Sequence, residues 1–293
     1  MERIASRISE IRGWRRYVLA WALGAIAAIS LPPISGTFVL LLSFSGLLLL
    51  LDGTRNYRDA AWDGWWFGFG FLTIGLYWIS NALVTDVEKF GWMIPFALLG
   101  LPAFLALFTS LGTIAAKFFW VTGPFRILSL SCGWTLSEIA RGHLLTGFPW
   151  NLIGYTWSWS PLMMQSASIV GIYGLGFFTV FIASSPGALI FSENNKKPLI
   201  VWTSVISALL LSTVLVTYGS IRLYHATEDR ISGLNFRIVQ ANISQIQKWD
   251  DKFKQDNLLK YISLSIEESR FNLTHIVWPE TAVTYFINDQ PHV

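Results

Sequence analysis

The chain has 293 residues, of which 53% are hydrophobic and only 13% are charged. An average soluble domain carries about 25% charged residues, so this composition predicts a membrane protein. The net charge is only +3, and the Lys and Arg residues lie mostly beside apolar stretches, which indicates topology signals and excludes a nucleic-acid partner. The single cysteine, Cys132, excludes an intrachain disulfide, and the four dispersed histidines predict no metal site and no cofactor.

Seven long apolar stretches follow one another between Tyr17 and Ser220. A helix needs about 20 apolar residues to cross the roughly 30 Å hydrocarbon core, and helices of other lengths adjust by tilting. We therefore predict a polytopic α-helical bundle of about seven spans, the first two of which are short. The predicted spans are Tyr17–Pro33, Gly36–Leu51, Ala61–Asn81, Gly91–Phe118, Pro124–Ala140, Leu162–Phe191 and Leu199–Ser220.

The positive charges between the spans predict an orientation. With a cytoplasmic N-terminus, the inner segments hold eleven Lys and Arg residues, and the outer loops hold only Lys89 and Arg141. The eleven are Arg3, Arg7, Arg12, Arg15, Arg16, Arg55, Arg58, Lys117, Arg126, Lys196 and Lys197. Seven crossings then place the C-terminal segment outside the cytoplasm. The six further spans favour an uncleaved first anchor over a cleaved secretory signal.

The residues after Ser220 read as soluble sequence, so we predict two domains, 1–220 and 221–293. Asn235–Ala241 is strand-like, Asp251–Arg270 has helical spacing, and His275–Trp278 is a short apolar strand. This order predicts the first βαβ part of an α/β domain with a parallel sheet covered by helices. One such unit is too small for a complete core, so more sheet from a longer chain or a partner is expected.

A carboxylate, Glu280, comes directly after the second predicted strand, in Val277-Trp278-Pro279-Glu280-Thr281-Ala282. Pro279 ends the strand there, and sites in open α/β sheets collect beyond the carboxyl ends of strands. Glu280 is therefore a candidate catalytic residue. For an arbitrary Pro-Glu after a strand, a solvated loop glutamate is the commoner interpretation.

Several motifs resemble one known family. Trp278-Pro279-Glu280-Thr281-Ala282 resembles the opening of the nitrilase, or carbon-nitrogen hydrolase, superfamily, and Gln240-Ala241-Asn242-Ile243 with Gln247-Lys248-Trp249-Asp250 resembles the extracytoplasmic domain of apolipoprotein N-acyltransferases. Glu138 to Tyr155, including Thr146-Gly147-Phe148-Pro149-Trp150, is similar to that family's loop after the fifth span, and Trp66-Phe67-Gly68-Phe69-Gly70 is similar to its third span. The resemblance covers nearly the whole chain.

The resemblance implies a Glu-Lys-Cys triad that moves an acyl chain from a phospholipid to the N-terminal diacylglyceryl cysteine of a bacterial apolipoprotein. Glu280 matches the glutamate, which acts as general base, while the lysine stabilises the oxyanion and the cysteine forms a thioester. The expected partners are the phospholipid donor, the diacylated acceptor and the membrane. The implied location is the bacterial cytoplasmic membrane, with the C-terminal segment in the periplasm.

The chain ends at Val293, soon after Glu280, whereas the family's lysine and cysteine lie well beyond the glutamate. The expectation is therefore an incomplete form that is inactive alone. Cys132, inside the fifth predicted span, is interpreted as a packing residue. The alternative function is a non-catalytic remnant or a lipid-binding membrane scaffold, and a transporter has little support because intramembrane charges are scarce.

Three aromatic residues are candidate substrate-binding residues. The resemblance matches Trp249 to a tryptophan that helps substrate engage, although an interfacial aromatic at a helix start explains it equally well. Phe148 and Trp150 lie in the outer loop, where an aromatic belt competes with a lipid-entry role. Glu138 and Arg141 are three positions apart near a helix end, which favours a structural ion pair.

Overall fold

The computed structural model describes residues 8–84, 86–121, 123–190, 198–227 and 231–284. The chain divides into two compact units, Met1–Ala226 and Thr227–Val293. The last long helix of the first unit, α11, continues to Tyr224, so this unit ends later than the predicted boundary at residue 220. Four of the predicted inner charges, Arg3, Arg7, Lys196 and Lys197, lie outside the described residues.

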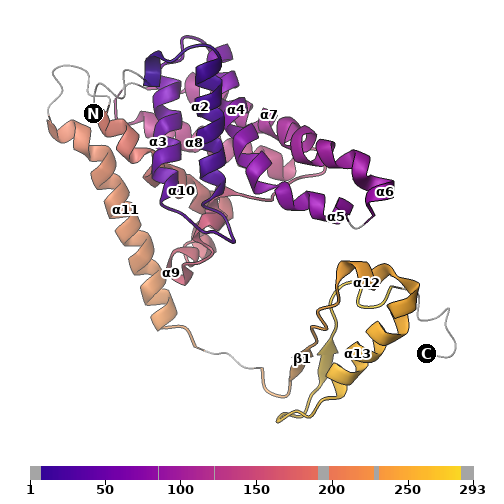
Figure 1. The fold of residues 1–293 in the computed structure, drawn as a ribbon. Coiled ribbons are helices and arrows are strands. Elements are labelled where there is room, and N and C mark those ends of the chain that lie inside the picture. The colour runs from indigo at the N-terminus through magenta and orange to yellow at the C-terminus, as the bar shows by residue number, and fades with distance from the viewer. Residues whose placement is uncertain (1–7, 85, 122, 191–197, 228–230, 285–293) are drawn as a thin grey trace. The chain divides into compact units, whose positions relative to one another are not determined.

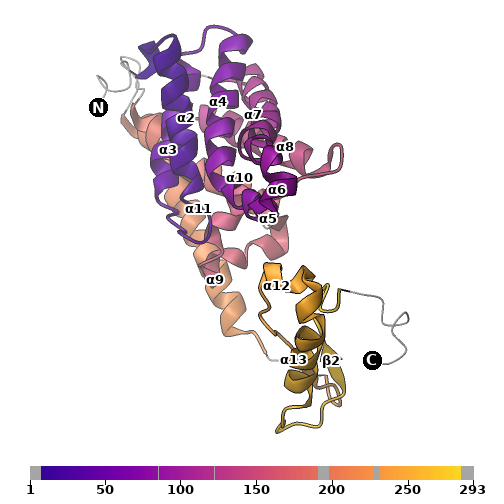
Figure 2. The same ribbon diagram turned by 45° about the vertical axis from the view of Figure 1, so that its right-hand side comes forward.

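Each of the seven predicted apolar stretches overlaps a long helix of the first unit (Figures 1 and 2). These helices are α2 Trp14–Ala28, α3 Val39–Asp52, α4 Tyr57–Gly75, α7 Leu101–Phe118, α8 Arg126–His143, α10 Ala167–Ile190 and α11 Pro198–Tyr224. Shorter elements connect them: η1 Tyr77–Ile79, α5 Ser80–Val84, α6 Val87–Phe90, η2 Gly91–Met93, η3 Phe96–Gly100, η4 Ile153–Trp157 and α9 Pro161–Met164.

Fewer helices than seven are long and apolar enough to cross a membrane by themselves. Within the described ranges there are three, Val87–Phe118, Ala167–Leu189 and Trp202–Tyr224, and up to four if the bent pair Tyr57–Gly75 and Tyr77–Val84 counts as one span. Helix α3 has only 14 residues, which at 1.5 Å per residue is shorter than the hydrocarbon core. The structure therefore supports a multi-helix membrane protein, and the seven crossings remain a prediction.

Small residues bring the helices of the bundle close together. Helix α4 packs against α2 and α7, α7 packs against α8, and α10 contacts α3, α8 and α11. Between α4 and α7, the Thr109 hydroxyl donates to the Gly64 carbonyl at 3.0 Å and the Thr113 hydroxyl donates to the Ala60 carbonyl at 2.8 Å. Such small and hydroxylic side chains are typical of helix interfaces in membranes, because they allow close backbone approach.

Three aromatic rings fill the centre of the first unit. Phe44 of α3 lies 4.9 Å from Trp134 of α8 and 5.5 Å from Phe67 of α4, measured between ring centroids. Phe67 and Trp134 lie 5.6 Å apart at nearly a right angle. These ring contacts, of which the two made by Trp134 are edge-to-face, join three helices that are distant in the sequence, so the core forms only when the bundle assembles.

Three positively charged side chains contact the carboxyl end of α3. From the sequence, these residues were interpreted only as signals of membrane topology. Arg16 of α2 donates to the Leu50 carbonyl, and Lys117 of α7 donates to the Leu51 carbonyl at 3.1 Å. Arg126 of α8 forms an ion pair with Asp52 at 3.3 Å. The last carbonyls of a helix have no intrahelical partner and carry partial negative charge, so these cations stabilise the end of a short apolar helix.

Two predicted spans are not continuous helices. The stretch 162–191 is divided into α9 and α10, and Gly171 inside α10 has a φ of 66° and a ψ of 179°, which breaks the helical path. Ahead of α7, Phe96–Gly100 forms a π-helical turn, and Pro102 at the start of α7 supplies no N–H to the helical ladder. The breaks therefore lie at glycine and proline, the usual causes of kinks.

The interpretation of Cys132 as a packing residue is wrong. Its side chain is exposed on the surface of α8, whereas its neighbours Ser131 and Gly133 are buried. The hydrophobic setting of Cys132 in the sequence did not reveal which side of the helix faces the bundle.

The second unit is a parallel βαβ arrangement, as the sequence predicted. Strands β1 Phe236–Ile238 and β2 His275–Val277 pair in parallel, with Phe236 opposite His275. Between them lie α12 Gln245–Trp249, η5 Asp251–Phe253 and α13 Lys254–Ile266.

The hydrophobic core of the second unit is small and lies on one face of the sheet. Val239, Ala241 and Tyr261 are buried, and Trp278 packs against them. Phe236 and Ile238 are exposed, with Ile238 at 80%. The expectation that helices cover the sheet therefore holds for one face in the described residues, and the apolar side chains of the other face lie open.

Candidate functional site

Glu280 lies in a turn directly beyond β2. The Ala282 N–H donates to the Pro279 carbonyl at 3.1 Å, which makes Pro279–Ala282 a β-turn with Glu280 and Thr281 as its central residues. Trp278 anchors the entry to this turn, because its ring lies 5.2 Å from that of Tyr261 and its N–H donates to the Ser265 hydroxyl at 2.8 Å. The Glu280 side chain is exposed and therefore accessible to a reacting group.

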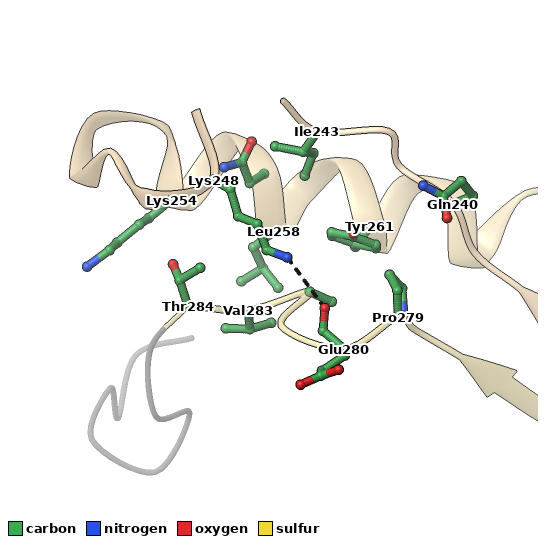
Figure 3. A pocket seen from close by; sticks show the side chains of 12 residues that line it. Gln240, Ile243, Lys248, Lys254, Leu258, Tyr261, Pro279, Glu280, Val283 and Thr284 are labelled. Carbon is green, nitrogen blue, oxygen red and sulfur yellow. Dashed lines mark hydrogen bonds between the residues drawn. The ribbon is translucent and has the colours of Figure 1, made fainter. Parts of the chain in front are cut away.

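A pocket of about 140 Å³ lies between this turn and the helices α12 and α13 (Figure 3). Its lining includes Gln240, Lys248, Leu258, Tyr261 and Glu280. Figure 3 shows the Lys248 side chain reaching toward the turn, whereas the Glu280 carboxylate points away from Lys248. Lys248 Nζ donates to the Thr281 hydroxyl at 2.8 Å and to the Glu280 carbonyl at 3.4 Å.

Sequence reasoning missed Lys248 as a member of this site. The notable neighbour in its motif was Trp249, which ends α12, is 58% exposed and is not among the described residues that line the pocket. The bond from Lys248 to Glu280 joins residues that are 32 positions apart, so no local pattern signals it. The adjacent positions Lys248 and Trp249 thus have different environments.

In the first unit, α8 holds the loop that follows it through two buried charged side chains, Glu138 and Arg141. Arg141 Nη1 donates to the Phe148 carbonyl at 2.9 Å and to the Trp150 carbonyl at 2.6 Å. Glu138 Oε1 accepts the Ile153 N–H at 2.8 Å. Glu138 and Arg141 make no direct ion pair, because each side chain bonds to the loop backbone, but their opposite charges lie close enough to attract each other.

The two aromatic candidates of this loop differ in position. Trp150 is exposed, and its ring lies 5.1 Å from that of Trp78. Both line an open groove of about 640 Å³ together with Tyr155. Phe148 is half-buried and packs against the hydrophobic core of the bundle. The loop therefore presents Trp150 to the groove and uses Phe148 as an anchor.

Charged side chains that could hold a metal do not gather in the part of the chain that the structure describes. No group of three or more His, Cys, Asp and Glu residues with suitable placement is present there. The Glu280 carboxylate by itself accepts and returns protons.

A bundle of apolar helices joined to a parallel βαβ unit defines the class of this protein: an integral membrane protein with an α/β unit that carries a carboxylate at a strand end. Residues 23–185, more than half of the chain, match the family model of the apolipoprotein N-acyltransferase N-terminal domain. The chain belongs to this family.

Curated relatives extend the similarity along the chain. It is 38% identical over 299 residues to an apolipoprotein N-acyltransferase of Rhodopseudomonas palustris, which covers 98% of this chain and 55% of the relative. It is also 38% identical to proteins of the same name from Allorhizobium ampelinum and Brucella suis, with 99% of this chain and 56% of each relative covered. The chain thus spans a little more than half the length of these relatives.

Proposed function

We propose that the chain provides the membrane anchor and the general base of an enzyme that transfers an acyl group from a phospholipid to the N-terminal diacylglyceryl cysteine of bacterial apolipoproteins. The observation that carries the proposal is the exposed Glu280 in the turn beyond β2 of a chain that belongs to this family. A carboxylate at the carboxyl end of a parallel strand is accessible to substrate and is held by the sheet.

Glu280 acts with a cysteine thiol and a lysine, the other members of the triad that the resemblance implies. The carboxylate takes the thiol proton, the thiolate attacks the donor ester carbonyl, and the ester C–O bond breaks. The proton passes to the departing lysophospholipid alcohol, and a thioester remains. The lipoprotein amine then attacks the thioester, Glu280 takes the amine proton, and the thiol is released with that proton.

The proposed setting is the bacterial cytoplasmic membrane, with the helices of domain 1–220 making about seven crossings. The N-terminus is cytoplasmic, and domain 221–293, a nitrilase-like portion, is periplasmic. Arg16, Lys117 and Arg126 support this orientation, because positive charges collect on the cytoplasmic side and these three gather at one end of α3. Glu280 then lies on the side where lipoproteins mature.

Substrate contacts are proposed for Trp150 and Trp249, and a supporting role is proposed for Phe148. Trp150 contacts the phospholipid in the groove that it lines with Trp78, and Phe148 keeps the loop in place from the core side. Trp249 contacts the acceptor, because its exposed ring follows the pocket-lining Lys248 directly in the chain. An amphipathic ring at a membrane surface suits contacts with lipid chains.

The test is Glu280→Gln in the protein as the cell produces it, with mass spectrometry of a lipoprotein N-terminus. The amide keeps the shape of the side chain but cannot accept the thiol proton, so acylation is expected to fall by at least about 100-fold. Glu268→Gln, which changes another exposed carboxylate of the second unit, is the matched control and should leave acylation unchanged.

Unchanged acylation in Glu280→Gln removes Glu280 from the mechanism. If phospholipid binding persists without any transfer in the unsubstituted protein, the alternative of a lipid-binding membrane scaffold is supported instead. Its candidate lipid site is the aromatic groove of Trp78 and Trp150.

A further inference from the structure

The turn that carries Glu280 has a backbone that its residues do not favour. Thr281, the third residue of the turn, has a φ of 53°. A positive φ at this position is usual in type II turns, where glycine normally occupies it. For a β-branched residue the left-handed region costs on the order of 1–3 kcal/mol, so surrounding contacts must hold it.

Lys248 supplies such contacts from the other side of the pocket. Its ammonium group bonds to the Thr281 hydroxyl and to the Glu280 carbonyl, one acceptor from each central residue of the turn. The Glu280 carbonyl belongs to the central peptide, whose orientation distinguishes type I from type II turns. A cation bonded to this carbonyl therefore favours one orientation of that peptide.

The base of the Lys248 side chain is itself fixed. Ser244 begins α12 by accepting the Gln247 N–H at 3.4 Å, and the Asn257 side chain of α13 donates to the Gln247 carbonyl at 3.1 Å. Figure 3 shows the Lys248 ammonium on the side of the turn opposite to the Glu280 carboxylate. Within the described residues, no ion pair joins the two side chains, so Lys248 acts on the backbone of the turn.

We propose that Lys248 is a positioning residue that locks the Pro279–Ala282 turn and thereby sets the direction in which Glu280 presents its carboxylate. This inference rests on the proposed function of Glu280 as general base. Proton transfer needs the base within hydrogen-bond reach of the reacting group, and a displacement of 1 Å costs up to about 100-fold in rate. The contribution of Lys248 is therefore expected in kcat.

The experiment compares Lys248→Met and Lys248→Arg in the enzyme as purified from its host, with a phospholipid donor and a diacylated lipopeptide acceptor. Lys248→Met is expected to lower kcat by about tenfold or more and to change each KM by less than about twofold. Lys248→Arg keeps a cationic donor and should restore most of kcat. Lys260→Met, which removes an exposed lysine from α13, is the matched charge control and should leave both constants unchanged.

A second comparison uses the strained residue itself. Glycine adopts positive φ without a steric penalty, so in a Thr281→Gly background the turn needs less support from Lys248. The kcat loss caused by Lys248→Met should then be smaller than in the wild-type background, a non-additivity that a double-mutant cycle measures. Equal losses of kcat in the two backgrounds would contradict the proposal that Lys248 holds the turn in place.

The failure of this inference is distinguishable from the failure of the proposed function. Lys248→Met should speed amide hydrogen exchange at Ala282, whose N–H closes the turn, whether or not Glu280 is catalytic, because the turn opens more often. Unchanged exchange together with wild-type kcat overturns the positioning role. A loss in Lys248→Met that appears only as a raised donor KM also overturns it, since Lys248 would then bind the lipid headgroup.

Discussion

Arg16 of α2 and Asp63 of α4 form a two-point ion pair inside the helical bundle. Arg16 Nε lies 2.7 Å from Asp63 Oδ1, and Nη2 lies 2.6 Å from Oδ2. The side chains are 5% and 0% exposed, so water screens neither charge. Because Arg16 also donates to the Leu50 carbonyl, this pair ties together three helices, α2, α3 and α4.

Removal of Asp63 should therefore destabilise the bundle strongly. In Asp63→Ala the Arg16 guanidinium remains buried without its counter-charge, which costs about 3–5 kcal/mol. Thermal unfolding in detergent should show a clearly lowered midpoint. Asp59→Ala, at a half-buried position in the first turn of the same helix where the carboxylate accepts, among the described residues, only the Arg55 N–H, is the control and should unfold much closer to the wild-type temperature. Equal midpoints for the two variants would contradict the structural role of the pair.

Substitutions of Trp150 and Phe148, in the loop after α8, should have different effects on function and on stability. Trp150→Ala removes an exposed ring from the groove, so we expect a donor KM raised about tenfold, equivalent to 1.4 kcal/mol, with an unchanged unfolding temperature. Phe148→Ala should instead cost about 2 kcal/mol of stability, less than the roughly 3–5 kcal/mol of a fully buried phenylalanine. If both variants change only stability, the loop has a structural role alone.

Arg237 should be the main polar support of the second unit. From β1 its Nη1 donates to the Ser265 carbonyl at 2.7 Å and to the Glu267 carbonyl at 2.6 Å, at the end of α13. Arg237→Met keeps the aliphatic stem and removes these bonds, which should destabilise this unit by about 2 kcal/mol. Faster amide hydrogen exchange across α13 would show the effect. Arg270→Met, at an exposed position beyond the helix, is the control.

Labelling of single introduced cysteines should determine the orientation of the chain in the membrane. In a Cys132→Ser background, Asp256→Cys on α13 should react with a membrane-impermeant maleimide in intact spheroplasts. Arg55→Cys, in the exposed segment between α3 and α4, should react only after lysis. Reaction at 256 only after lysis would place the second unit in the cytoplasm, where the bilayer separates Glu280 from the proposed acceptors.

Local patterns were enough to predict most elements. The apolar stretches predicted where the long helices lie, because the length of an apolar run and its flanking charges are properties of neighbouring residues. The alternation of strand-like and helical segments predicted the parallel βαβ unit and the place of Glu280 just beyond β2. The breaks at Gly171 and at the π-helical turn were missed, because a glycine inside an apolar run does not specify its backbone angles.

The sequence by itself determined the class of protein, the positions of the long helices along the chain and the position of the candidate general base beyond the second strand. Only the tertiary structure decided what the charged residues do: Arg141 and Glu138 hold a loop, Arg16 pairs with Asp63, and Lys248 reaches the turn of Glu280. It also decided that Cys132 faces outward. The physical reason is that these contacts join residues far apart in the chain. Composition and spacing do not distinguish between the possible partners of a charged residue, whereas packing in the folded protein does.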